Sequence, residues 1–115
     1  LLNILKIIAA VLNVAFGAWV LWQPHRIAQA SSFELIGSRG IAEMRVAFGG
    51  FFVGMGLALL LLNNDAAYQL FGIGYLTAFG VRVASLFIDD RKTQLDPSYI
   101  AIGAVELVMA IIFIV

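Results

Sequence analysis

The stretch IAEMRVAFGGFFVGMGLALLLLNND, residues 41–65, decides the fold. Residues 41–62 are mainly apolar, and an α-helix needs about 20 such residues to cross a bilayer. The sequence Asn-Asn-Asp at 63–65 then interrupts the apolar run. We therefore expect a membrane-spanning helix at 41–62, and a tight turn after it that makes the next helix an antiparallel neighbour.

Three further apolar runs lie outside this stretch, at residues 1–22, 66–88 and 98–115. Pro24 ends the first run, because proline cannot continue a helix and disfavours helical geometry in the residue before it. The sequence Asp-Pro-Ser at 96–98 predicts the start of the last helix, with Asp96 or Ser98 as the cap and proline in the first turn.

Membrane-spanning segments must pair their own backbone polar groups, so only helices and closed barrels are available. Barrel strands alternate apolar and polar residues over about ten positions. The four runs here do not alternate and are longer than such strands. The sequence therefore predicts an all-α fold, an integral membrane bundle of four transmembrane helices that forms a single domain over residues 1–115.

The composition excludes several other classes of protein. Hydrophobic residues make up 63% and charged residues 12%, against about 45–50% and about 25% in soluble domains. The formal net charge is zero and there is no cysteine. Nucleic acid is therefore not an expected partner, and disulfides and thiolate metal sites are excluded.

The connections predict the orientation in the membrane. The segment at 25–40 mixes apolar and polar residues, and both a short interfacial amphipathic helix and an ordinary polar loop fit it. Basic residues gather on the side that holds this segment and the loop at 89–97. They are Arg26, Arg39, Arg91 and Lys92, whereas the opposite side has only Lys6. The positive-inside rule then predicts a bacterial inner membrane protein with both termini on the non-cytoplasmic side.

Four ionisable residues lie inside or at the edge of the predicted spans: Glu43, Arg45, Arg82 and Glu106. A charge at the centre of a bilayer costs at least about 2.5–3.5 kcal/mol, so such residues usually face the bundle interior and pair. All four fall in the same half of the membrane. We expect Arg82 to bridge Glu43 and Glu106, and Arg45 to face elsewhere or to extend toward the interface.

Helical spacing places the two carboxylates and Arg82 on faces that suit close packing. Glu43 shares a face with Gly50 and Gly54, a G-x-x-x-G pair that favours close helix approach. Similar faces recur on the last two helices. Their members are Tyr68, Tyr75, Ala78, Arg82 and Ser85 on one, and Tyr99, Gly103, Glu106 and Ala110 on the other. Gly50, Gly54, Gly80 and Gly103 are the predicted packing glycines, and Tyr68, Tyr75 and Phe79 could line a ligand groove.

Two motifs in these helices carry a resemblance. The first is E-M-R-V-A-F-G-G at 43–50, and the second is G-V-R-V-A-S at 80–85, followed by two aspartates and by Glu106. Together they resemble a bacterial family of small four-helix membrane proteins of unknown function. The chain departs from that pattern at Phe48 and at Asp90-Arg91. The resemblance implies four spans and a characteristic set of Glu43, Arg45, Arg82 and Glu106, but no reaction.

The sequence predicts no enzyme, cofactor or metal site. No histidine lies within a span, and no serine has partners arranged for hydrolysis. The expected function is that of a structural or accessory subunit of a larger membrane complex, in contact with lipid and with other subunits or a second copy. Two alternatives stay open: a small proton- or ion-coupled transporter that uses the buried Glu/Arg site, and a membrane protein that binds lipid, quinone or pigment.

Overall fold

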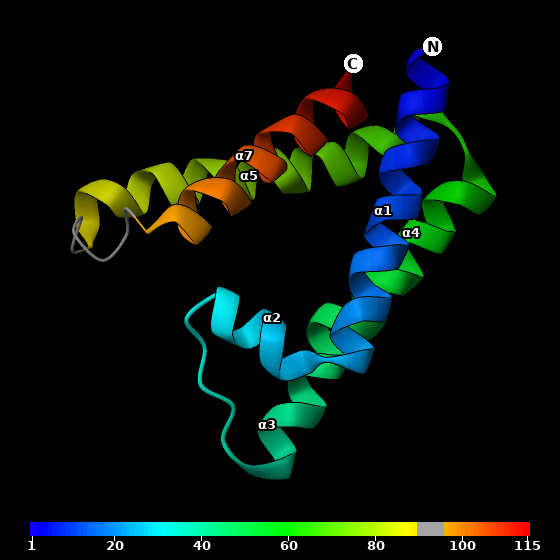
Figure 1. The fold of residues 1–115 in the computed structure, drawn as a ribbon. Coiled ribbons are helices and arrows are strands. Elements are labelled where there is room, and N and C mark those ends of the chain that lie inside the picture. The colour runs from blue at the N-terminus through cyan, green and yellow to red at the C-terminus, as the bar shows by residue number, and fades with distance from the viewer. Residues whose placement is uncertain (90–95) are drawn as a thin grey trace. The chain divides into compact units, whose positions relative to one another are not determined.

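All regular secondary structure is helical in residues 1–89 and 96–115, the part of the chain that the computed structural model describes. A π-helix, η1, joins two α-helices into one continuous helix at Gly37–Leu62. This confirms the predicted all-α fold. The elements, drawn in Figure 1, are α1 (Leu2–Trp22), α2 (Pro24–Ala30), α3 (Gly37–Met44), η1 (Arg45–Gly50), α4 (Phe51–Leu62), α5 (Asp65–Ile88) and α7 (Pro97–Ile114).

Four of the described helices are long and apolar enough to cross a membrane: α1, the continuous α3–η1–α4 helix, α5 and α7. The shortest has 18 residues, which at 1.5 Å per residue gives about 27 Å, close to the hydrocarbon thickness of a bilayer. Their lengths and composition suggest insertion into a membrane, as predicted.

The helix ends follow the expected local chemistry. Asn63 ends α4 in the left-handed conformation, with φ of 43°, which asparagine tolerates better than most residues. Asn64 caps α5, because its side-chain oxygen accepts a hydrogen bond of 2.8 Å from the Ala67 amide. Asp96 caps α7 by accepting from the Ser98 amide at 3.2 Å. Asp96 is therefore the cap, and not Ser98.

The segment between the first two spans is helical only in part. Pro24 is the first residue of the seven-residue helix α2, and Ile27 and Ala28 are its buried apolar side chains. Residues 31–36 lie outside any helix, and Ser32 among them has a φ of 60°. Residues 25–40 thus contain a short helix, as one of the two alternatives expected, followed by an irregular turn and the first residues of α3.

The chain divides into two compact units. Residues 1–6 and 64–115 form the first, called here the α5–α7 unit. Residues 7–63 form the second, called the α1–α4 unit. The expectation of a single domain stays a prediction.

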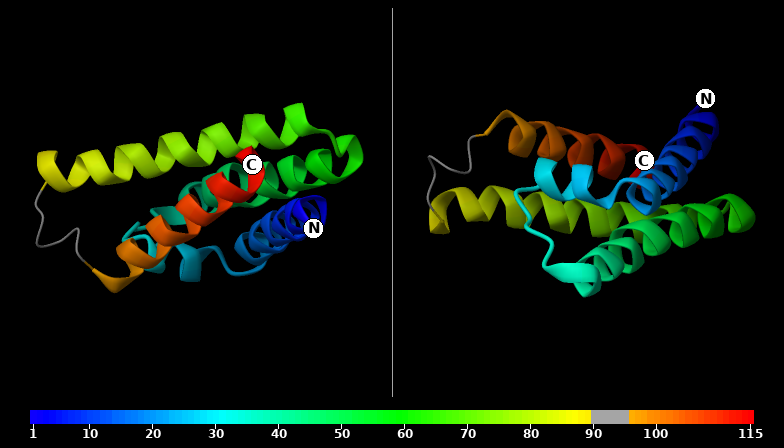
Figure 2. Two further views of the ribbon diagram at one scale, coloured as in Figure 1. Left: turned by 90° about the horizontal axis from the view of Figure 1, so that it is seen from above. Right: turned by 60° about the horizontal axis from the view of Figure 1, so that its bottom comes forward.

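In the α5–α7 unit, α5 and α7 lie side by side along an aromatic contact, and Figure 2 shows the pair from two directions. The rings of Tyr68 and Phe113 stack at 5.8 Å and both are buried. A Cβ atom at Gly72 would lie 2.9 Å from the Phe113 Cβ. Lys6 is also buried, with its ammonium 3.7 Å from an Asp65 oxygen. The absence of a side chain at Gly72 allows the close approach of the two helices.

In the α1–α4 unit, the backbones of α1 and of the helix at Gly37–Leu62 approach at three glycines. A Cβ at Gly17 would lie 2.6 Å from the Gly49 carbonyl oxygen, and one at Gly56 would lie 2.9 Å from the Ala10 oxygen. A Cβ at Gly49 would lie 2.6 Å from Leu21 Cδ2. These glycines let the two helices meet backbone to backbone, as small residues do in membrane proteins.

The predicted G-x-x-x-G pair is not at this contact. A Cβ at Gly54 would meet no described atom of its own unit within 4 Å, and one at Gly50 would meet only the Arg45 oxygen at 3.8 Å. Arg45, Gly49 and Gly56 recur at helical spacing on the side of the helix that meets α1. Gly50 and Gly54 lie on a different side, the one counted from Glu43, and their contact with another helix stays a prediction.

Candidate functional site

The structure brings Arg82 of α5 and Glu106 of α7 together as a two-point ion pair. Arg82 Nε donates to Glu106 Oε1 at 2.6 Å, and Nη2 donates to Oε2 at 3.0 Å. Both residues lie on the faces that helical spacing predicted for them. Parallel N–H···O bonds of this kind fix orientation as well as distance, because guanidinium and carboxylate are planar groups of matching width.

Residues of α7 position the Arg82 side chain. Its guanidinium carbon lies 4.6 Å from the centre of the Tyr99 ring, within the range of a cation–π contact. A Cβ at Gly103 would lie 3.0 Å from Arg82 Cδ, so this glycine leaves room for the arginine stem. Tyr99, Gly103 and Glu106 therefore form one side of α7 along which Arg82 lies.

Two hydroxyl groups hydrogen-bond to the Arg82 backbone. Ser85 Oγ donates to the Arg82 carbonyl oxygen at 2.7 Å, and Tyr99 Oη donates to the same oxygen at 2.8 Å. The two hydroxyls also lie within hydrogen-bond distance of each other; because each has a single proton, a bond between them takes the place of one of the two bonds to the carbonyl. Tyr99 thus contacts Arg82 through its ring and through its hydroxyl, which links α7 to the α5 backbone in addition to the ion pair.

The ion pair is largely shielded, with 22% of the Arg82 side chain and 12% of the Glu106 side chain exposed. Both carboxylate oxygens of Glu106 accept bonds from Arg82. In surroundings of low polarity, removing one partner of such a pair leaves an uncompensated charge and costs about 3–5 kcal/mol. The arrangement can therefore hold α5 and α7 in a single register.

Glu43 lies in the α1–α4 unit, where Arg39 Nε donates to its carboxylate at 3.0 Å. This is an exposed i,i+4 pair, with 86% and 62% of the two side chains exposed. Pairs of that kind contribute little to stability. The expectation that Arg82 also bridges to Glu43 stays a prediction.

Arg45 binds the end of α1. Its Nε donates to the Leu21 carbonyl oxygen at 3.1 Å. Leu21 is in the last turn of α1, where carbonyl groups have no partner within the helix. A cation there also interacts favourably with the helix dipole. Because Gly49 leaves room for Leu21 four residues further along, Arg45 and Gly49 together hold the end of α1 against η1.

This contact has no signal in the sequence, since its acceptor is a backbone carbonyl. Gly17 and Gly49 were missed because the packing glycines were assigned to the face that carries Glu43, whereas α1 packs on the face that carries Arg45. Tyr99 and Ser85 could have been assigned to the Arg82 site, because each lies on the same helical face as the charged residue of its own helix.

The three residues proposed as a ligand groove lie at the α5–α7 contact or beside it. Tyr68 and Tyr75 stack against Phe113, at ring distances of 5.8 Å and 6.2 Å. Within this unit their rings take part in the helix contact, and the ligand groove stays a prediction. Phe79 is half-buried on the same helix. Of the other predicted packing glycines, Gly103 is at the contact, whereas a Cβ at Gly80 would meet no described atom of its own unit within 4 Å.

The family resemblance drawn from the motifs at 43–50 and 80–85 stays a prediction. No protein-family model matches the chain, and no curated protein or solved structure matches it either.

Proposed function

We propose that this protein is a structural or accessory subunit of a larger membrane complex and carries no reaction of its own. The observation that carries the proposal is the pairing of Arg82 with Glu106 on both carboxylate oxygens. Because both carboxylate oxygens are bonded to the guanidinium, the ion pair holds α5 and α7 against each other. Arg45 acts similarly, because it joins η1 to the last turn of α1.

The outer face of α5 supports association with other membrane proteins. Gly74 and Gly80 lie on α5 away from its contact with α7, and a Cβ at either would meet no described atom of the α5–α7 unit within 4 Å. Large apolar side chains, including Ile73 and Val81, are exposed beside them. Helices associate in lipid through close packing at small residues, so this face suits a neighbouring helix.

The proposed location is a bacterial inner membrane, with both termini on the non-cytoplasmic side. The support is the positive charge on one side, since Arg26 lies between the first two spans and Arg39 lies in the first turn of the second. Arg91 and Lys92, which support the same orientation, lie outside the described residues.

The test is purification of the tagged chain from its native membranes in a mild detergent, followed by native mass spectrometry. We expect a defined partner at fixed stoichiometry with the wild type and with Val81→Leu. Gly80→Leu should lose it, because the larger side chain prevents close approach on the same face. Retained helicity and an unchanged melting temperature of Gly80→Leu would show that its own fold is intact.

Two results would contradict the proposal. The first is a wild-type protein that leaves native membranes as a lone monomer. The second is a proton or ion flux in proteoliposomes that Glu106→Gln abolishes, which would favour the transporter alternative instead.

A further inference from the structure

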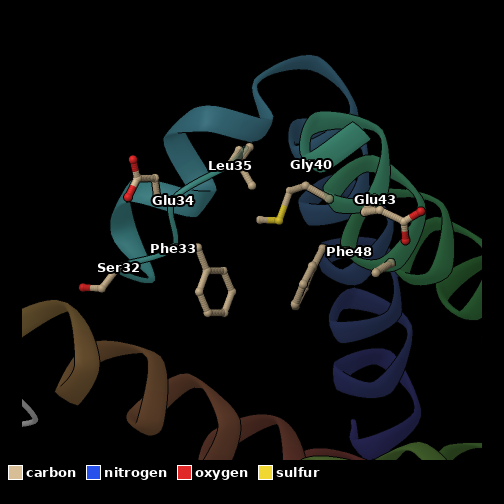
Figure 3. A pocket seen from close by; sticks show the side chains of 9 residues that line it. Ser32, Phe33, Glu34, Leu35, Gly40, Glu43 and Phe48 are labelled. Carbon is tan, nitrogen blue, oxygen red and sulfur yellow. The ribbon is translucent and has the colours of Figure 1, made fainter. Parts of the chain in front are cut away.

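A pocket of about 410 Å³ opens in the α1–α4 unit between the irregular turn and the first part of the long helix. Figure 3 shows Phe33 and Phe48 on its two sides, with both rings extending in a similar direction. Their ring centres lie 6.1 Å apart. Leu35 and the buried Met44 complete an apolar floor. Small-molecule sites typically have volumes of about 300–1,000 Å³ and walls of this kind.

The backbone around the pocket is fixed. The Phe33 amide donates to the Ala28 carbonyl oxygen at 2.7 Å, which ties the turn to α2. Leu35 packs so closely on α3 that a Cβ at Gly40 would lie 3.3 Å from the Leu35 carbonyl carbon. Leu35 and Phe48 also pack against a core that contains Val20, Ile27 and Met44. The pocket is therefore preformed rather than a gap beside a loose loop.

The π-helix forms one wall of this pocket, since Phe48 belongs to η1. Short π-helical turns are rare in proteins and occur frequently at functional sites. Two residues of η1 have different neighbours. Gly49 contacts Leu21 of α1, and Phe48 lies beside the pocket. The unusual backbone thus coincides with the cavity.

The rim of the pocket is polar and carries negative charge. Glu34 and Glu43 lie at opposite sides of it and turn away from the apolar centre (Figure 3). Glu43 is already paired with Arg39. Glu34 forms no ion pair with any residue that the structure describes. A positively charged group at the rim would be complementary to that carboxylate.

The pocket also lies where one membrane span ends. Its helical wall comes from the first turns of the continuous helix at Gly37–Leu62. That helix of 26 residues is about 39 Å long, longer than the hydrocarbon core it would cross. The end that carries Arg39 and Glu43 therefore belongs at the headgroup level, where amphiphiles place their polar groups.

From these observations we propose that the pocket binds a single-chain amphiphile with an ammonium head. The alkyl chain lies along Phe33 and Phe48 on the floor at Met44, and the ammonium group lies at the rim beside Glu34. This assignment is independent of the accessory role, because it uses none of the residues at the α5–α7 contact.

The test is a titration of the full chain in a nonionic detergent, with bound molecules counted by native mass spectrometry. The probes are dodecyltrimethylammonium, dodecyl sulfate and a lysophosphatidylethanolamine, which carries its ammonium on a lipid headgroup. We expect one dodecyltrimethylammonium per chain and no saturable binding of the sulfate. Saturable binding of the lysolipid would assign the site to membrane lipids, and its absence would assign it to free alkylammonium compounds.

Matched variants locate the site. Glu34→Gln should weaken the binding of dodecyltrimethylammonium by about threefold to tenfold, the range expected for a partly exposed charge contact. Phe33→Ser should weaken it similarly. The controls are Asp89→Asn, in the other unit, and Phe51→Ser, since Phe51 is 53% exposed and Phe33 is 50% exposed. Equal binding of the sulfate, or unchanged affinity of both pocket variants, would overturn the proposal.

Discussion

The Arg82–Glu106 pair shows how much can be inferred at the scale of single residues. Each residue lies on a face of its own helix that also carries small residues or tyrosines, and both fall in the same half of the membrane. Helical spacing and depth together therefore predict the contact between the two side chains. The bond from Arg45 to the Leu21 carbonyl could not be inferred in that way. Every residue has a carbonyl, so the sequence does not mark the one that accepts.

Replacing Arg82 with leucine should destabilise the protein by about 3–5 kcal/mol, because Glu106 would be left without its partner in a shielded position. The measurement is the unfolding midpoint in detergent. The control is the double variant Arg82→Leu/Glu106→Leu, which removes both charges and should recover part of the loss. A midpoint for Arg82→Leu equal to that of the wild type would show that the pair does not stabilise the fold.

At the scale of elements, the sequence predicted the spans and their caps but not the glycines at the α1 contact. Glycine-rich helices predict close packing, but glycines on more than one face leave open which face packs on which neighbour. α1 packs on the face that carries Arg45, Gly49 and Gly56. Gly50 and Gly54 lie on another face, and their contact with a neighbouring helix stays a prediction.

Two glycine-to-alanine variants separate these faces. A Cβ at Gly17 would lie 2.6 Å from the Gly49 oxygen and 2.7 Å from the Val53 nitrogen, both backbone atoms that cannot move aside cheaply. Gly17→Ala should therefore destabilise by about 1–3 kcal/mol, as overpacking does. Gly54→Ala should be neutral or stabilising by about 0.5–1 kcal/mol, because alanine favours the helix. Chemical unfolding measures both, and an equal loss of stability would contradict the assigned contact.

At the scale of the whole molecule, hydropathy predicted four helices of membrane-spanning length. Their number follows from apolar content, which is a property of each segment by itself. The division into an α5–α7 unit and an α1–α4 unit has no comparable signal in the sequence. It depends on which helix faces pack together, and thus on contacts between residues far apart along the chain.

The orientation of the molecule can be tested directly, because the chain contains no cysteine. Ser38→Cys and Asn63→Cys place single thiols at the two ends of the helix at Gly37–Leu62. In intact bacterial cells, a membrane-impermeant maleimide should label Asn63→Cys at once and Ser38→Cys only after permeabilisation, because basic residues favour the cytoplasmic side. The opposite pattern would reverse the orientation. Equal labelling of both in intact cells would mean that this helix does not cross the membrane, since a hydrocarbon core of about 30 Å must separate the two thiols.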